Sequence, residues 1–246
     1  MGQIAPVFFS ARPDISGHFL FATGLQHAIV QHAWLQVVLD IVFVVLNPLM
    51  AIVFIRGIRM SALLACCTVV FNIVYAYFFS SISFVSREPF IAWMLMPLLF
   101  TATGCRSFYF KFHVLRILFI LFFATAGLWK LRGGGAFNTE QMSGILLHQF
   151  ASVLAVPDSG WHYPLLRFLI NHPPISFVLY WLVILAEVIF LLGLFTRKYD
   201  RLLLWLLLGF LVCDYFLMQI NYFSWLPFAV LFYYSQLEMP IQNGID

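Results

Sequence analysis

The chain is dominated by apolar runs long enough to cross a lipid bilayer. A transmembrane helix needs about 20 mostly apolar residues, or roughly 30 Å at a rise of about 1.5 Å per residue. Runs near this length occupy residues 34–55, 60–84, 89–103, 112–131, 174–195, 201–222 and 225–234. The third run is short and contains Pro97, and the last is shorter still. The sequence therefore predicts five to seven spans.

Composition excludes most other classes of protein. Only 9% of the 246 residues are charged and 63% are hydrophobic, whereas about 25% are charged in a typical soluble domain. This is too little polar surface for a cytosolic enzyme, a secreted disulfide scaffold or a disordered regulator. The net charge of +3 comes without a long basic run, so no nucleic-acid partner is expected. We predict an all-α, polytopic membrane helical bundle, with residues 1–246 as one domain, a core bundle at 34–235 and the lipid bilayer as its main partner.

Two regions do not fit the pattern of a membrane span. Residues 1–33 mix aromatic, histidine and amide side chains before the first run, which predicts a segment lying in the membrane interface. The long connection at 132–173 opens with three consecutive glycines. Within it, Asn138 or Thr139 is a plausible N-cap for an amphipathic helix. The apolar face of that helix, at spacings of three and four, consists of Met142, Ile145, Leu146, Phe150, Val153 and Leu154.

The basic residues of the connecting loops predict an orientation, because cytoplasmic loops carry an excess of Lys and Arg. The loops after the first, third and fifth runs hold Arg56, Arg59, Arg106, Lys111, Arg197, Lys198 and Arg201. The opposite side holds Arg12, Arg87, Lys130, Arg132 and Arg167. We therefore expect the N-terminus and the 132–173 connection to lie outside.

Ionisable side chains inside the apolar runs are the strongest functional signal, since such groups are costly in a bilayer and usually pair. Counted from the ends of their runs, Asp40, Lys130 and Asp214 form an outer set, and Arg116 and Glu187 form an inner set. The opposite charges of the inner set predict a structural ion pair. In the outer set, a lysine near two acids in a desolvated pocket can act as a base or as a fixed cation.

The histidines are weaker signals. His148 projects from the amphipathic helix and His162 follows Trp161 in an aromatic stretch, so they could face the same outer cavity, although a lone interfacial histidine is more often simply solvated. His27 and His32 are five residues apart, not the four that put two ligands on one helical face. Since no known metal-binding or hydrolase motif is present, we predict no metal site.

Three short segments carry a resemblance to a known group of membrane proteins. Residues 122–131 (FFATAGLWKL) end in Ala-Gly-x-x-Lys, and residues 185–197 (LAEVIFLLGLFTR) place a glutamate before a Leu-Leu-Gly-Leu-x-Thr-Arg ending. This pattern resembles the superfamily that joins HTTM (horizontally transferred transmembrane) domains, vitamin K-dependent gamma-carboxylase membrane domains and DoxX-type proteins. Residues 213–223 resemble the following HTTM helix, but Asp214 stands where that pattern commonly has histidine.

The resemblance implies a redox-linked function. In the carboxylase branch the matching lysine deprotonates a reduced quinone, and DoxX-type proteins are tied to quinone-linked or thiol redox complexes. By resemblance, Lys130 is therefore the first candidate functional residue and Glu187 the second. Nothing resembles the large soluble part of the carboxylase, so carboxylation of a protein substrate is not expected. The expected location is a bacterial inner (plasma) membrane.

Two functional hypotheses follow, and whether the chain is an enzyme stays open. In the first, an outward-facing cavity around Lys130 binds a quinone or a lipid, with Lys130, Asp214 and Glu187 as catalytic candidates. Its expected ligand-binding residues are Asp40, Trp129, His148, Trp161 and His162. In the alternative, the chain is a non-catalytic subunit that docks a membrane or periplasmic partner for secretion, maturation or redox chemistry. A transporter ranks third, since no internal repeat is present.

Overall fold

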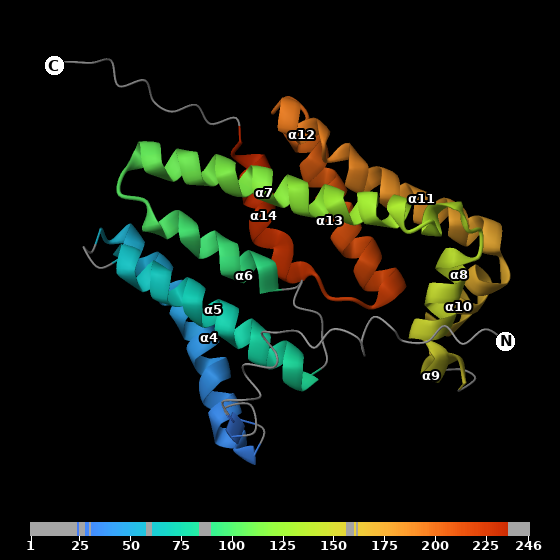
Figure 1. The fold of residues 1–246 in the computed structure, drawn as a ribbon, viewed down its shortest axis with the longest axis horizontal. Helices are drawn as coiled ribbons and strands as arrows, with labels where there is room; N and C mark the ends of the chain where they lie inside the picture. The colour runs from blue at the N-terminus through green and yellow to red at the C-terminus, as the bar shows by residue number, and fades with distance from the viewer. Residues whose placement is uncertain are drawn as a thin grey trace. The chain divides into compact units, whose positions relative to one another are not determined.

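The computed structural model describes residues 24, 28–29, 31–57, 61–83, 90–155, 160 and 162–235 (Figure 1). Throughout this described part the regular elements are α-helices and short 3-10 helices, without a strand. The predicted all-α fold class is confirmed. Most of the N-terminal segment 1–33 and Trp161 lie outside the described residues.

Five helices are long and apolar enough to cross a membrane. They are α4 (Ala33–Ile55), α5 (Ser61–Ser83), α7 (Cys105–Arg132), α11 (Pro173–Ile189) with its continuation α12 (Leu192–Phe195), and α13 (Asp200–Met218). Two shorter apolar stretches match the two weakest predicted runs: α6 (Ile91–Leu95) with η2 (Met96–Thr101), and η4 (Phe223–Trp225) with α14 (Leu226–Tyr233). These lengths and compositions are consistent with an integral membrane protein of five to seven spans.

The chain divides into two compact units, residues 1–108 and 109–246, and the single-domain organisation stays a prediction. In the first unit α5 packs against α4 and η2. A buried amide pair holds them: Asn72 Nδ2 donates to Asn47 Oδ1 at 3.0 Å and to the Trp93 carbonyl oxygen at 2.6 Å. Such interhelical hydrogen bonds stabilise helix association in lipid, where apolar side chains supply no hydrophobic driving force. The helix changes from α6 to 3-10 geometry at Met96, one residue before Pro97, and a proline is a common cause of such a change.

In the second unit α7 runs antiparallel to α11 and α12, as the pairing of their residues shows. Arg116 bonds to Gly193, Phe123 packs on Phe190 with ring centroids 4.5 Å apart, and Gly127 faces Glu187. The core between these helices, α13 and α14 consists largely of buried aromatic rings. Its fully buried phenylalanines are Phe119, Phe123, Phe190, Phe228 and Phe232.

The long connection of the second unit folds into short helices that pack on α11 (Figure 1). After η3 (Gly135–Phe137) come α8 (Gln141–Gln149), α9 (Ala151–Leu154) and α10 (His162–Asn171). The predicted amphipathic face is confirmed, because Met142, Leu146 and Phe150 are buried in one cluster with α10 and α11. The expected N-cap is wrong by one or two residues. Glu140 is the N-cap of α8, and Asn138 Oδ1 instead accepts the Glu140 N–H at 3.0 Å.

Candidate functional site: the Lys130–Glu187 ion pair

Lys130 and Glu187 form an ion pair between α7 and α11. The Lys130 Nζ donates to Glu187 Oε1 at 2.5 Å. The two partners differ in exposure: the Lys130 side chain is 30% exposed, whereas that of Glu187 is 2% exposed. The Lys130 side chain is therefore partly exposed at the surface of the unit, while the Glu187 side chain is buried inside it.

Gly127 lets the two helices approach closely at this site. A Cβ on Gly127 would lie 3.0 Å from Glu187 Cβ and 3.1 Å from Val188 Cγ2, tighter than ordinary van der Waals contact. Lys130 is one turn further along α7, and helical side chains lean toward the N-terminus of their helix. Its long stem thus reaches back to the level of Gly127, where Glu187 crosses. The Ala-Gly-x-x-Lys ending has a local structural reason: the glycine makes room for the acid that the lysine binds.

The second oxygen of Glu187 distinguishes this ion pair from an ordinary one. Glu187 Oε2 is buried and has no hydrogen-bond partner; in the described part of the chain only His113 Nδ1 shares this condition. A buried polar atom without a partner costs about 1–3 kcal/mol, and such atoms in native proteins call for an explanation. With Oε1 engaged by the ammonium, Oε2 remains as an acceptor for a proton or a donor group.

The predicted Arg116–Glu187 pair is wrong, because each residue has a different partner. Arg116 pairs with Asp200 at the start of α13: its Nε donates to Oδ2 at 2.7 Å, and its Nη2 donates to Oδ1. The same Nη2 also bonds to the carbonyl oxygen of Gly193 at 2.8 Å. Both side chains are almost fully buried, at 4% and 0% exposure. The bidentate geometry and the carbonyl bond satisfy the charges on both sides.

The assignment of Glu187 to an inner set is also corrected. Distances from the ends of apolar runs placed it near Arg116, but such distances do not fix the register between two helices. The observed antiparallel register sets Gly193 beside Arg116 and Glu187 beside Gly127. Asp200 is absent from the candidates taken from the sequence because it lies before the apolar run, next to a basic turn, and its position is typical of a loop. The available signal was its place in the first turn of a helix, where acids are favoured by the helix dipole.

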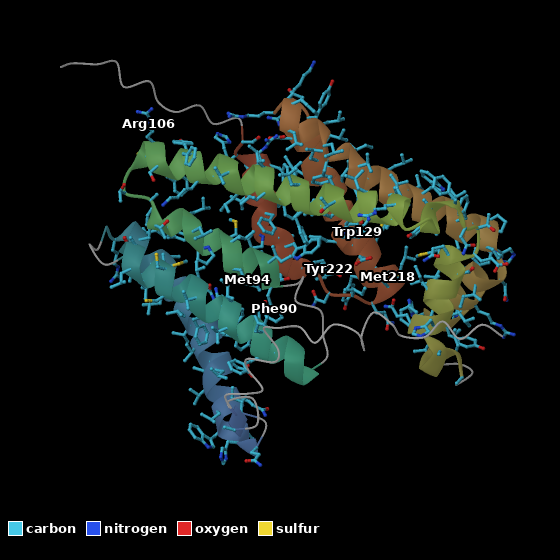
Figure 2. All side chains as sticks on the ribbon, in the orientation of Figure 1. Phe90, Met94, Arg106, Trp129, Met218 and Tyr222 are labelled. Carbon is cyan, nitrogen blue, oxygen red and sulfur yellow. The ribbon has the colours of Figure 1, made fainter. Side chains whose placement is uncertain are left out.

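The other predicted site residues have contacts of their own. Asp40 belongs to the first unit, where its Oδ1 accepts a hydrogen bond from Tyr75 at 2.8 Å. Asp214 is half-buried on α13, and its backbone carbonyl accepts the N–H groups that end this helix. Trp129 is 64% exposed on α7, with the Arg132 guanidinium 4.9 Å from its ring centroid (Figure 2).

The two histidines have different surroundings. His148 is exposed on α8. His162 is buried: its Nε2 lies 3.3 Å from the Leu217 carbonyl oxygen and its Nδ1 lies 3.1 Å from Gln219 Nε2. Gln149 adds a bond of 2.8 Å to the carbonyl oxygen of Met218, which Figure 2 labels at the end of α13. His162 therefore ties the connection to the end of α13, which is a structural role.

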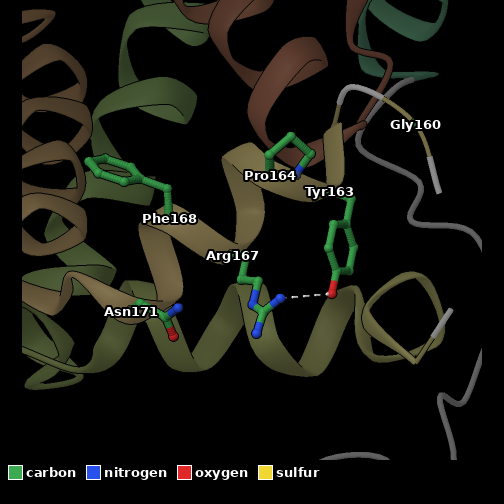
Figure 3. A pocket seen from close by; sticks show the side chains of 6 residues that line it. All are labelled: Gly160, Tyr163, Pro164, Arg167, Phe168 and Asn171. Atoms are coloured by element: carbon green, nitrogen blue, oxygen red, sulfur yellow. Dashed lines mark hydrogen bonds between the residues drawn. The ribbon is translucent and has the colours of Figure 1, made fainter. Parts of the chain in front are cut away.

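A surface depression of the second unit lies along α10. This open hollow of about 570 Å³ is lined by Gly160, Tyr163, Pro164, Arg167, Phe168 and Asn171 (Figure 3). Within it Arg167 reaches the Tyr163 hydroxyl at 3.4 Å. Among the described residues no group of three or more His, Cys, Asp or Glu side chains is placed to hold a metal ion.

No family model matches the chain, and comparisons with curated proteins and with solved structures find no match either. The resemblance to HTTM, gamma-carboxylase and DoxX-type membrane domains thus stays a prediction from the short motifs around Lys130 and Glu187.

Proposed function

We propose that this is a multi-spanning membrane protein of the HTTM/DoxX type in which the Lys130–Glu187 pair binds an apolar redox molecule, a quinone, or a lipid. The observation that carries the proposal is the asymmetry of the pair: a partly exposed lysine side chain bound to a buried carboxylate with one oxygen that has no hydrogen-bond partner. A purely structural pair would gain nothing from leaving Oε2 unsatisfied.

The chemistry of the two side chains suits an oxygen-bearing ligand. The ammonium has three N–H donors and gives one to Glu187 Oε1, so two remain for a carbonyl or phosphate oxygen. A proton taken up by Glu187 would rest on Oε2, because Oε1 already accepts from Lys130. A quinone, when bound, supplies the capacity to exchange two electrons and two protons. Lys130 would orient its oxygen, and Glu187 would hold a proton beside it.

The test is the content of the purified protein. The full chain is purified in mild detergent, extracted, and analysed by mass spectrometry for quinones, lipids and co-purifying proteins. We expect one quinone or lipid species near one equivalent in the wild type. Lys130→Arg should lower it by about tenfold or more, a change of about 1.4 kcal/mol, because arginine is bulkier and permanently protonated. The control Lys198→Arg changes an exposed loop lysine and should retain the ligand.

Equal ligand content in the two variants would refute the proposal. A stoichiometric co-purifying protein without a small molecule would instead support the alternative, a non-catalytic subunit that docks a membrane or periplasmic partner.

The proposed location is a bacterial inner membrane with the 132–173 connection outside. The excess of Arg and Lys in the loops after the first, third and fifth long runs supports this orientation. Single cysteines introduced at residues 134 and 197 in a cysteine-free background test it with a membrane-impermeant reagent. Labelling of intact cells at 134 and not at 197 is expected, and the reverse result would invert the topology.

A further inference from the structure

The first unit contains an acidic cavity that the proposed function does not use. The Tyr75 hydroxyl on α5 donates to Asp40 Oδ1 on α4 at 2.8 Å. A cavity of about 230 Å³ opens beside this bond, lined by both residues together with Gln36, Leu39, Phe78 and Phe79. Asp40 lies seven positions after the start of α4, which corresponds to about 10 Å along the helix. The carboxylate is therefore within the apolar span.

The Asp40 carboxylate has no cationic partner among the described residues. Its bond is to a neutral hydroxyl, whereas Asp200 and Glu187 in the second unit each face a cation. The nearest arginine described on the same helix, Arg56, is sixteen positions away, or about 24 Å along the axis. Ionised groups at membrane depth usually pair with an opposite charge and often mark binding sites. A bound cation would supply the missing charge.

The polar atoms that line the cavity are arranged as acceptors. The Tyr75 hydroxyl donates a hydrogen bond to Asp40 Oδ1 and keeps its lone pairs, and Asp40 Oδ2 accepts no hydrogen bond from the described residues. Gln36 gives an amide N–H to the Ile29 carbonyl oxygen at 3.0 Å and keeps its amide oxygen. An ammonium group, with three donors and no acceptor, complements such a lining.

The walls of the cavity are apolar and held in place. The Tyr75 ring stacks on Phe43 with centroids 4.4 Å apart and on Phe79 with centroids 6.0 Å apart. Because stacking fixes the ring, its hydroxyl is positioned toward Asp40 before any ligand arrives. Leu39 and Phe78 add carbon surface beside the polar atoms. Pockets with a few placed polar groups on an apolar wall are typical of small-molecule sites.

We propose that Asp40 and Tyr75 form a binding site for a primary ammonium group carried on an apolar chain. The ammonium bonds to Asp40 and to the lone pairs of Tyr75, and the carbon chain packs on Leu39, Phe78 and Phe79. Two sources present this chemistry within a membrane: the ethanolamine headgroup of a phospholipid and a free lipophilic amine. The site is independent of the Lys130–Glu187 pair.

Thermal unfolding of the detergent-purified full chain tests the charge requirement, with hexylamine as the probe and hexanol, of the same chain length, as the neutral control. Hexylamine should raise the Tm of the wild type and hexanol should not. Asp40→Asn, which keeps the shape of the side chain, should abolish the shift. Tyr75→Phe keeps the stacked ring and should reduce it. Glu140→Gln, which removes an exposed acid from the second unit, should leave it unchanged, as should Lys130→Arg.

Equal Tm shifts for hexylamine and hexanol, or a hexylamine shift that survives Asp40→Asn, would overturn the proposal. Should Asp40→Asn fail to fold, an undiminished shift in Tyr75→Phe would overturn it as well.

Vesicles distinguish the two sources. The protein is reconstituted in phosphatidylethanolamine or in phosphatidylcholine with the same acyl chains, since the choline headgroup has no N–H to donate. A higher Tm in phosphatidylethanolamine that disappears in Asp40→Asn identifies the lipid headgroup as the source. An Asp40-dependent hexylamine shift without a lipid preference identifies a free amine.

Discussion

Helix α7 carries two ion pairs that differ in how many hydrogen bonds they make and in how deeply their partners are buried. Near its middle, Arg116 meets Asp200 with two side-chain bonds and adds the Gly193 carbonyl, and both partners are buried. Near its end, Lys130 meets Glu187 through a single carboxylate oxygen. The first pair is closed and satisfied. The second leaves one oxygen of its carboxylate without a partner and its lysine side chain partly exposed.

We interpret this difference as a structural use of charge at the first pair and, under the proposed function, a ligand-binding use at the second. A buried pair holds helices together only if its geometry satisfies both desolvated ions, and Arg116–Asp200 meets that condition across α7, α12 and α13. Lys130–Glu187 does not meet it, yet it retains groups that can bind or exchange a proton. The comparison predicts that changes at the first pair act mainly on stability, and that changes at the second act mainly on ligand binding.

The largest effect is expected for Asp200→Asn. The amide keeps the shape of the carboxylate but leaves the guanidinium of Arg116 buried without a counter-charge. Stranding one partner of a buried pair costs about 3–5 kcal/mol, so the free energy of unfolding in detergent should fall by that amount.

The double variant Arg116→Met/Asp200→Leu is the control for this prediction. It replaces both ions with apolar side chains and should recover much of the loss. If the double variant is no more stable than Asp200→Asn, the pair is not the source of the effect.

The next effect concerns Gly193, whose carbonyl accepts from Arg116. A Cβ at this position would lie 2.7 Å from Ile120 Cδ1 and 2.8 Å from Leu203 Cδ1. Gly193→Ala should therefore force the ends of the buried Ile120 and Leu203 side chains to shift and cost about 1–3 kcal/mol, as overpacking does. Gly209→Ala on α13 is the matched control, since a Cβ there meets nothing within 4 Å. It should gain about 0.5–1 kcal/mol from helix propensity. If chemical unfolding gives the same free energy of unfolding for Gly193→Ala and Gly209→Ala, an added methyl group at residue 193 meets no steric conflict.

The sequence predicts much of this fold because its signals are local. Apolar runs set the number of long helices, and spacings of three and four identify Met142, Leu146 and Phe150 as one buried face. The ion pairs could not be predicted in the same way, because they depend on the register between helices. Arg116 meets Asp200, and Glu187 meets Lys130, because of how the helices are aligned, which the position of a residue within its own run does not fix. Lys130 and Glu187 were both singled out, but their direct contact follows from Gly127, and no single run reveals such an approach.

A smaller stability effect is expected for Glu187→Gln. The amide oxygen can still accept from Lys130, and because the Lys130 side chain is already 30% exposed, its ammonium can alternatively turn outward. The loss of unfolding free energy should be about 1 kcal/mol, in the range of exposed pairs and well below that of Asp200→Asn. The amount of ligand that remains bound after purification should nevertheless fall strongly, because an amide nitrogen replaces Glu187 Oε2, the oxygen proposed to hold a proton. A stability loss as large as that of Asp200→Asn would make the second pair structural.

The smallest stability effect, and the sharpest test of the comparison, comes from exchanging the two cations. Lys130→Arg keeps a positive charge beside Glu187 at a partly exposed position, so the free energy of unfolding should change by no more than about 0.5 kcal/mol. The reverse exchange, Arg116→Lys, replaces a bidentate fork with a point charge. It loses bonds to a charged partner, each worth about 1.5–3 kcal/mol, and should lower stability measurably. The effects on ligand content should be the reverse. Lys130→Arg should lose the ligand, whereas folded Arg116→Lys should keep it. If both exchanges destabilise equally and neither alters ligand content, the two ion pairs serve one structural purpose and the functional reading of Lys130 fails.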